Sequence, residues 1–173
     1  MADSKEVIEA REKANDREFF KERVKTMPLL IEWANDDIRN DKEILLEAVK
    51  IDGGALEFSS KELKDDKDVL QAAVNNAGWT ACYASERLSN DKDVMLEAVK
   101  NDGQALYYAS EELRDDKDVV IEAVKNKPII LKYASLRLRK DKEVAIAAVS
   151  SGKKAYEFIA EELKKDEDIL KLV

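Results

Sequence analysis

The sequence is poor in the residues that most often carry chemistry or break a chain. Its 173 residues include no histidine, one cysteine, two prolines and five glycines. Without histidine, the most common general base and a frequent zinc ligand are both missing. The single thiol, Cys82, excludes an internal disulfide, which fits a reducing compartment, so we expect a cytoplasmic location. So few glycines and prolines are not typical of a disordered or linker-rich chain.

Long hydrophobic runs are also missing. No apolar run approaches the ~20 residues of a membrane span, and residues 1–6 are polar, so no signal peptide is expected. Charged residues make up 39% of the chain, and 38 acidic against 30 basic side chains give a net charge of −8. We therefore expect no direct binding to nucleic acid or to an anionic membrane, because both need a basic surface.

Repetition is what the sequence has in abundance. A 25-residue unit that starts with aspartate occurs six times in succession and fills residues 16–165 without insertion or deletion. A seventh copy begins at Asp166 and runs only to Val173. Self-similarity at a fixed period is the signature of a solenoid. The six units are called repeats 1 to 6 below, and a residue is located by its position, 1 to 25, within its repeat. The repeats begin at Asp16, Asp41, Asp66, Asp91, Asp116 and Asp141.

Each repeat predicts two helices. Aspartate at position 1 is expected to cap the first helix, and the acid at position 3 suits its positive end. Positions 4, 5, 8 and 9 are almost always apolar and share one face of that helix. We expect glycine at position 13 to take the left-handed conformation that ends the helix, and proline there to start the next one. Position 13 is Pro28, Gly53, Gly78, Gly103 and Pro128 in repeats 1 to 5.

The second half of each repeat is predicted to form an α-helix of roughly eleven residues, which is stable only when it stacks on its neighbours. Its aromatic residue at position 18 and its aliphatic residue at position 23 are predicted to be core, and position 19 is mostly small. Position 18 is Trp33, Phe58, Tyr83, Tyr108, Tyr133 and Phe158. Position 23 is Ile38, Leu63, Leu88, Leu113, Leu138 and Leu163.

Together these patterns predict an all-α fold, namely a right-handed α-solenoid of six 25-residue helical hairpin repeats. Residues 1–15 lie outside the repeat frame and are predicted to form an N-terminal cap helix that starts after Ser4 and runs through Ala14, with Val7, Ile8, Ala10 and Ala14 as its apolar members. Residues 16–165 form the six-repeat solenoid, and residues 166–173 form a C-terminal half-repeat stub. The apolar side chains of the stub, such as Leu170, would be left uncovered on one side, so we expect weak end-to-end self-association.

The repeated pattern reads D-K-[DE]-V-x-L-E-A-V-K-x-x-G-x-A-L-x-Y-A-S-E-E-L and is clearest from Asp91 to Leu113. It resembles the repeat family called domain of unknown function 4116. The resemblance covers residues 16–165 and implies a fold, but the family carries no assigned activity, catalytic residues or cofactor. Leucine-rich variant repeats have a similar length, but the second segment here reads as full α-helix, which makes them the weaker match. Four residues depart from the pattern: Arg23, Pro28, Pro128 and the shifted Gly152.

No pattern in the chain predicts an enzyme, a metal site or a bound cofactor. Acidic clusters such as residues 65–68 superficially resemble calcium loops, but apolar Val69 and Leu70 follow where further oxygen ligands are needed. Cys82 has no histidine to act as its base. No carboxylate occupies a position that is apolar in the other repeats, where a raised pKa would be expected. We interpret the acids as helix caps and solvated surface.

Positions 14, 17 and 21, which would share one face of the second helix, change character from repeat to repeat; we call them the variable stripe. The candidate partner-binding residues on this stripe are Trp79, Glu86, Tyr107, Glu111, Ile129 and Leu136. Large apolar groups, tryptophan and tyrosine above all, are typical interface anchors. The alternative is that neighbouring repeats bury them.

The sequence therefore predicts a non-enzymatic scaffold that binds a protein or peptide. Seven acids against three bases on the variable stripe favour a basic partner. Three alternatives stay open. The first is a structural or designed repeat protein with no natural partner. The second is an acidic decoy that occupies a nucleic-acid-binding protein. The third is an enzyme, which a deep cleft with converging polar groups would favour.

Overall fold

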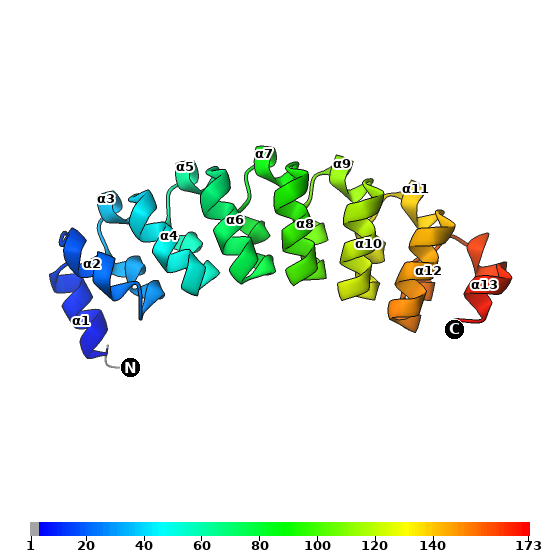
Figure 1. Ribbon diagram of the computed structural model, residues 1–173, viewed down its shortest axis with the longest axis horizontal. Helices are drawn as coiled ribbons and strands as arrows, with labels where there is room; N and C mark the ends of the chain where they lie inside the picture. Colours follow the sequence, from blue (N-terminus) through cyan, green and yellow to red (C-terminus); the bar gives the residue numbers. More distant parts are fainter. Residues whose placement is uncertain (1–3) are drawn as a thin grey trace.

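The computed structural model describes residues 4–173, and in that part of the chain it contains helices and turns but no strand. After a first helix, the same succession of helices recurs every 25 residues. The units lie side by side in a shallow arc, with the two termini at opposite ends (Figure 1). Each first helix of a unit contacts the first helix of the next. The predictions of an all-α fold and of tandem helical repeats are therefore confirmed.

The helices of a unit come in three kinds. The first α-helices are α2 (Arg17–Arg23), α4 (Lys42–Ile51), α6 (Lys67–Asn76), α8 (Lys92–Asn101), α10 (Lys117–Asn126) and α12 (Lys142–Ser151). The 3₁₀ helices are η1 (Pro28–Trp33), η2 (Gly53–Phe58), η3 (Gly78–Tyr83), η4 (Gly103–Tyr108), η5 (Pro128–Tyr133) and η6 (Lys153–Glu157). The short α-helices are α3 (Asp36–Arg39), α5 (Lys61–Lys64), α7 (Glu86–Ser89), α9 (Glu111–Arg114) and α11 (Leu136–Arg139). The chain ends with η7 (Leu163–Lys165) and α13 (Glu167–Leu170).

The prediction of a single second α-helix is wrong. In repeats 1 to 5, a 3₁₀ helix and a four-residue α-helix take its place, separated by two non-helical residues, and in repeat 6 the two 3₁₀ helices η6 and η7 do so. In repeat 4 the two non-helical residues are Ala109 and Ser110, with ψ angles of 152° and 166°. The Ser110 hydroxyl accepts the backbone N–H of Leu113 at 3.2 Å, so this serine caps a new helix instead of continuing the old one. Because the second segment is not a full α-helix, it does not distinguish the chain from leucine-rich variant repeats.

The aspartate at position 1 caps the first helix, as predicted. A carboxylate oxygen of Asp91 accepts the backbone N–H groups of Asp93 at 3.1 Å and of Val94 at 3.2 Å. A carboxylate at the N-terminus of a helix also meets the positive end of the helix dipole. The same cap is present at Asp16, Asp41, Asp66, Asp116, Asp141 and Asp166.

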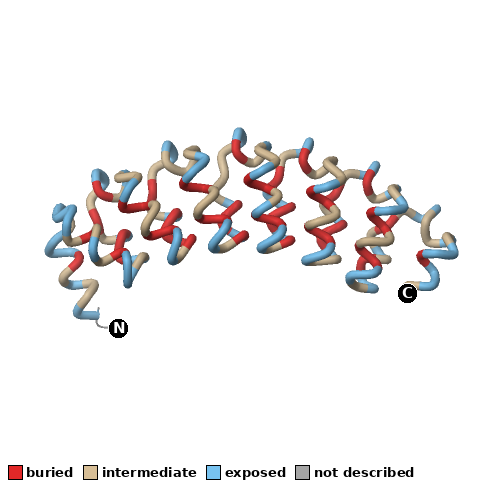
Figure 2. Tube along the Cα trace, viewed as in Figure 1, coloured by how far each residue is buried: buried red, intermediate tan, exposed pale blue. Residues whose placement is uncertain are grey.

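The buried residues lie where the first helices and the 3₁₀ helices pack against one another (Figure 2). Positions 4, 5, 8 and 9 are buried in repeats 2 to 6, as predicted, while Phe19 and Arg23 of repeat 1 are half-buried. Position 23 is buried or half-buried in every repeat. Positions 15 and 16, such as Ala105 and Leu106, supply the facing side of the core, which the sequence pattern did not predict.

The aromatic row at position 18 is not core. Tyr108 is 36% exposed, and the aromatic residues of the other five repeats are half-buried. The prediction assumed a continuous α-helix, whereas a 3₁₀ helix has three residues per turn and so presents a different set of side chains to the core. Position 18 consequently lies at the rim between repeats.

Helix α1 (Lys5–Glu12) precedes repeat 1 and contacts η1. Ser4 caps it by accepting the backbone N–H of Val7 at 3.4 Å, as predicted. The helix ends at Glu12, short of the predicted Ala14, and the chain turns before repeat 1. Ala10 is buried, but Ile8, predicted to lie on the apolar face, is 49% exposed. Residues 1–3 of the predicted cap segment lie outside the described residues.

Glycine at position 13 has a different role from the one predicted. None of the five glycines adopts a positive φ, so the expected left-handed conformation is wrong. These glycines are needed for close approach instead. A Cβ on Gly78 would lie 2.4 Å from the carbonyl oxygen of Ala98 in the next repeat, and one on Gly103 would lie 2.5 Å from that of Ala123. Neighbouring repeats thus touch backbone to backbone at position 13.

An asparagine of the following repeat completes this contact. The Gly78 N–H donates to Oδ1 of Asn101 at 3.0 Å, and Nδ2 of Asn101 donates to the carbonyl oxygen of Asn75 at 3.1 Å. Gly53 with Asn76 and Gly103 with Asn126 form the same bond, both at 2.9 Å.

Proline replaces glycine where that asparagine is missing. Position 11 of the following repeat is Ile51 after Pro28 and Ser151 after Pro128. Neither residue offers the asparagine carbonyl that accepts the N–H elsewhere. Proline has no N–H, so no buried donor is left unpaired at these two boundaries. Glycine with asparagine, or proline without it, is therefore the rule at the boundaries between repeats 1 to 6.

The close approach predicts that an added methyl group at Gly78 is costly. Gly78→Ala forces a Cβ against the backbone of the next repeat, and overpacking of this kind costs about 1–3 kcal/mol. Gly54→Ala is the matched control, because a Cβ there would meet a carboxylate oxygen of Asp52 at 3.0 Å and ring atoms of Trp79 at 3.6 Å, both on side chains. Urea denaturation measures the difference. Equal loss in the two variants would contradict the backbone contact.

Candidate functional site

The variable stripe is divided between two helices of each repeat. Positions 14 and 17 lie one turn apart on the 3₁₀ helix, whereas position 21 is the first residue of the short α-helix in repeats 1 to 5. The prediction that one continuous helix face carries all three is therefore wrong. Position 21 lies instead beside the next repeat, since Glu111 of α9 lines a shallow groove with Tyr133, Ala134 and Ser135.

The apolar candidate residues of the variable stripe are exposed. Trp79 is 45% exposed, Tyr107 52%, Ile129 37% and Leu136 72%. Glu86 and Glu111 are exposed as well. The alternative interpretation, that neighbouring repeats bury these side chains, does not hold for them.

Trp79 is exposed on one side and supported on the others. Its ring lies edge-to-face with Tyr83 at 6.0 Å between centroids. It also covers Gly54 of the preceding repeat, where a Cβ would lie 3.6 Å from two of its ring atoms. The absence of a side chain at Gly54 makes room for the indole. Trp79 is therefore an exposed aromatic surface whose orientation is fixed by packing.

Tyr107 joins two repeats through ring contacts. Its centroid lies 5.1 Å from that of Tyr108 and 4.9 Å from that of Tyr133 in the next repeat, and both contacts are edge-to-face. The three rings border a hollow of about 180 Å³ between η4 and η5. It is lined by Gln104, Tyr107, Tyr108, Lys127, Ile129, Ile130, Lys132 and Tyr133. The structure thus brings Tyr107 and Ile129 together, while Trp79 and Leu136 lie outside this hollow.

Cys82 and Tyr83 lie close to Glu57 of the preceding repeat. Burial raises the pKa of the Cys82 thiol, and the Glu57 carboxylate raises it further. A thiol with a raised pKa stays protonated near neutral pH and is a poor nucleophile. Burial and the Glu57 carboxylate also raise the pKa of Tyr83 to about 12. At this contact between repeats 2 and 3, Cys82 and Tyr83 therefore contribute hydrogen bonding and packing.

Sequence reasoning missed an ion-pair ladder that runs along the first helices. The basic residue at position 2 of each repeat bridges the acids at positions 1 and 3 of the next. Lys92 Nζ lies 2.8 Å from a carboxylate oxygen of Asp116 and 2.8 Å from one of Asp118. The bridging residues are Arg17, Lys42, Lys67, Lys92, Lys117 and Lys142. The sequence signal for this ladder was the D-K-[DE] motif itself. The basic residue of one repeat lies 24 and 26 residues before the two acids that it pairs with in the next.

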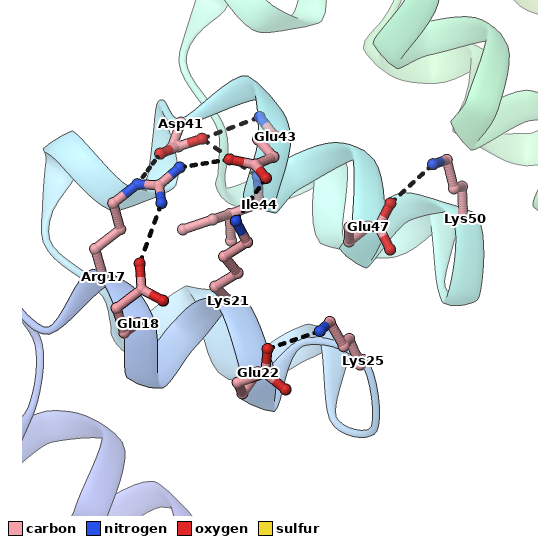
Figure 3. Close-up of polar contacts among 10 residues, drawn as sticks. All are labelled: Arg17, Glu18, Lys21, Glu22, Lys25, Asp41, Glu43, Ile44, Glu47 and Lys50. Carbon is pink, nitrogen blue, oxygen red and sulfur yellow. Dashed lines mark hydrogen bonds and ion pairs between the residues drawn. The ribbon is translucent and has the colours of Figure 1, made fainter.

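The first step of the ladder shows its geometry (Figure 3). Arg17 Nε lies 2.6 Å from an oxygen of Asp41, and its Nη2 lies 2.7 Å from an oxygen of Glu43. Lys21 contacts the other oxygen of Glu43 at 2.7 Å. Together Lys21 and Arg17 lower the pKa of Glu43 to about 2. Ion pairs within single helices, such as that of Glu47 with Lys50 at 2.9 Å, are also present.

The capping aspartates are the acidic steps of this ladder. Burial raises the pKa of Asp116, but the Lys92 ammonium and the backbone N–H groups at the helix start outweigh burial and lower it. A carboxyl whose pKa is lower in the folded chain stabilises the fold above its unfolded pKa, near pH 4. That contribution is lost as the pH falls through the folded value.

The ladder predicts an acid-dependent effect of Lys92→Met. The variant loses both bridges to the next repeat, so its urea midpoint at about pH 7 falls modestly below that of the wild type. Below the lowered carboxyl pKa values the bridges are absent from both proteins, and the difference disappears. Lys100→Met, which removes only a pair within one helix to Glu97, is the control. A Lys92→Met effect that persists in acid would show that lost packing, not charge, is responsible.

Residues 4–173 contain no group of three histidine, cysteine, aspartate or glutamate side chains placed to hold a metal ion. None of the helices over the same residues is long and apolar enough to cross a membrane.

Comparison with known proteins identifies the repeats. A family model described as Domain of unknown function (DUF4116) matches residues 16–64, 41–89, 66–114 and 116–164. Each match spans almost two successive repeats, and together they cover most of the chain. The resemblance expected from the sequence is therefore confirmed. No curated protein and no solved structure matches the chain.

Proposed function

Because the chain belongs to the family of domain of unknown function 4116, to which no activity is assigned, we propose its function from its own surface. It is a non-enzymatic scaffold that binds a protein or peptide segment along the variable stripe. The observation that carries this proposal is the set of exposed apolar side chains at positions that vary, within a chain whose other positions repeat.

We infer that the scaffold is a right-handed solenoid of six 25-residue repeats, with α1 covering one end and residues 166–173 forming a half-repeat at the other. Contacts between successive first helices support this architecture. Such solenoids present extended surfaces because each repeat offers the same positions at regular intervals. Self-association through the stub stays a prediction; Ile169 is buried there, whereas Leu170 and Val173 are 51% and 47% exposed.

Trp79, Tyr107 and Leu136 are the proposed anchors. Leu136 is the most exposed large apolar side chain in residues 4–173. Trp79 and Tyr107 are held by neighbouring rings, so little conformational entropy is lost when a partner covers them. Buried aromatic anchors contribute most of the binding energy in interfaces of this kind.

The charges beside the anchors orient the partner. Glu86 and Glu111 are exposed, and neither has an ion-pair partner among the described residues. We infer that basic groups of the partner lie over repeats 3 and 4, where these two carboxylates project. Exposed charges of this kind influence association rate and orientation more than affinity.

The test is a selection of random peptides, about twelve residues long, on the intact protein. Replacing Trp79, Tyr107 and Leu136 together by serine weakens binding of the selected peptides by about tenfold or more, while a cooperative unfolding transition remains. Fluorescence anisotropy measures the affinity, and circular dichroism monitors the fold.

The matched control replaces Glu47, Glu97 and Glu122 on the first helices by glutamine and leaves binding unchanged. Undiminished binding by the serine variant would place the site elsewhere. Failure to enrich any peptide would favour a purely structural repeat protein, and a serine variant that no longer folds would show that the three residues are packing elements.

A further inference from the structure

Charge is distributed unevenly along the chain. Although the net charge is −8, repeat 5 carries seven basic side chains against three acidic ones, and repeat 4 carries three basic against seven acidic. Repeat 5 also holds Ile129 and Leu136, two of the exposed apolar residues of the variable stripe. An electropositive, partly apolar unit therefore follows directly after an electronegative one.

Most cations of repeat 5 are already paired with carboxylates. Lys117 pairs with Asp141 and Glu143, Lys125 with Glu122, Arg137 with Asp115 and Lys140 with Glu162. Arg139 donates to the backbone carbonyl oxygen of Phe158 at 2.6 Å instead of pairing with a carboxylate. Lys127 and Lys132 also differ from the four paired cations, because neither forms an ion pair with any residue in the described chain. Lys127 Nζ donates to the side-chain carbonyl of Gln104, and Lys132 Nζ lies 4.8 Å from the ring centroid of Tyr133.

Both of these lysines line the hollow between η4 and η5. Its remaining lining consists of the three tyrosines, two isoleucines and Gln104, and no carboxylate borders it. Its volume of about 180 Å³ is small, and Tyr107 and Ile129 at its rim are exposed. The hollow thus combines two cations that lack a counter-ion with an apolar and aromatic wall.

We propose that this hollow binds an acidic side chain of a peptide segment, with a large apolar residue of the same segment packed on Tyr107 and Ile129. A carboxylate accepts charge-assisted hydrogen bonds from the Lys127 and Lys132 ammonium groups, which lack such a partner in the free protein. The apolar neighbour contributes the area that makes a small polar contact stable. This inference rests on the proposed function, and it names the partner's chemistry at one end of the surface.

The segment therefore carries charges of both signs. Its basic part lies over Glu86 and Glu111 of repeats 3 and 4, and its acidic part lies over repeat 5. This order fixes the direction in which the peptide runs along the row of repeats, because the reversed direction would place like charges together.

A single-stranded nucleic acid is the competing ligand, since lysines beside stacked aromatic rings suit phosphates and bases. It would place one phosphate per nucleotide along the surface. Repeat 4, whose η4 borders the hollow, carries seven acids against three bases, and an oligonucleotide that continued along this repeat would meet its excess of negative charge. A single carboxylate avoids that repulsion, which favours the peptide.

The experiment uses peptides of about twelve residues selected from a random library on the intact protein. We expect the enriched sequences to share an aspartate or glutamate close to a large apolar residue. Lys127→Gln combined with Lys132→Gln weakens their binding by about tenfold or more in fluorescence anisotropy. Changing the peptide carboxylate to its amide gives the same loss, and the two changes together add nothing further, because they remove the same interaction.

Lys50→Gln combined with Lys100→Gln is the matched control, because both lysines pair with a glutamate of their own helix. It leaves affinity unchanged. The inference is overturned if the losses of affinity from the lysine substitutions and from the peptide amide add fully. It is also overturned if the enriched peptides lack a common acid while Tyr107→Ser still weakens their binding, a result that leaves the proposed function intact. It is also overturned if labelled oligothymidine binds more tightly than the peptides. If substitutions on the variable stripe leave the affinity of the selected peptides unchanged, the proposed function is overturned as well.

Discussion

Backbone contact between successive repeats is the constraint on which the rest of the structure depends. The start of each 3₁₀ helix in repeats 2 to 4 lies so close to the next first helix that only glycine fits at position 13. An asparagine side chain then satisfies the buried N–H of that glycine. One inserted residue would move both partners out of register, which explains a period of 25 residues without insertion across residues 16–165.

This constraint separates the residues that hold the repeats together from those that are free to vary. Caps, asparagine bonds and the Arg/Lys ladder repeat at fixed positions and link each unit to the next. Positions 14, 17 and 21 take no part in these three kinds of link, although the rings of Trp79 and Tyr107 touch a neighbouring repeat. Large apolar groups such as Trp79 and Leu136 can therefore be placed there, and lost or gained, without changing the spacing of the units. A scaffold of this kind adapts to a partner while its fold stays the same.

The sequence predicted what depends on local pattern and missed what depends on distant backbone. Aspartate caps and the apolar face of the first helix follow from short spacings, and both were found. The break before Ser110 was missed because a mid-repeat serine reads equally as a helix residue or as a cap. The glycine contacts and the ladder join residues 20 or more positions apart, beyond any local rule. Likewise, the sequence identified Tyr107 and Ile129 as candidates without deciding whether they are exposed, and the lack of an ion pair at Lys127 and Lys132 became apparent only once their neighbours were placed.

Amide hydrogen exchange at Gly78 tests the central claim most directly. The account predicts that the N–H groups of Gly53, Gly78 and Gly103 exchange as slowly as amides within the first helices, because each is buried and bonded to an asparagine of the next repeat. Asn101→Ala should accelerate exchange at Gly78 far more than at Gly103, whose partner Asn126 is intact. Fast exchange at Gly78 in the wild type, or equal acceleration at both glycines in the variant, would contradict the claim that this contact holds neighbouring repeats together.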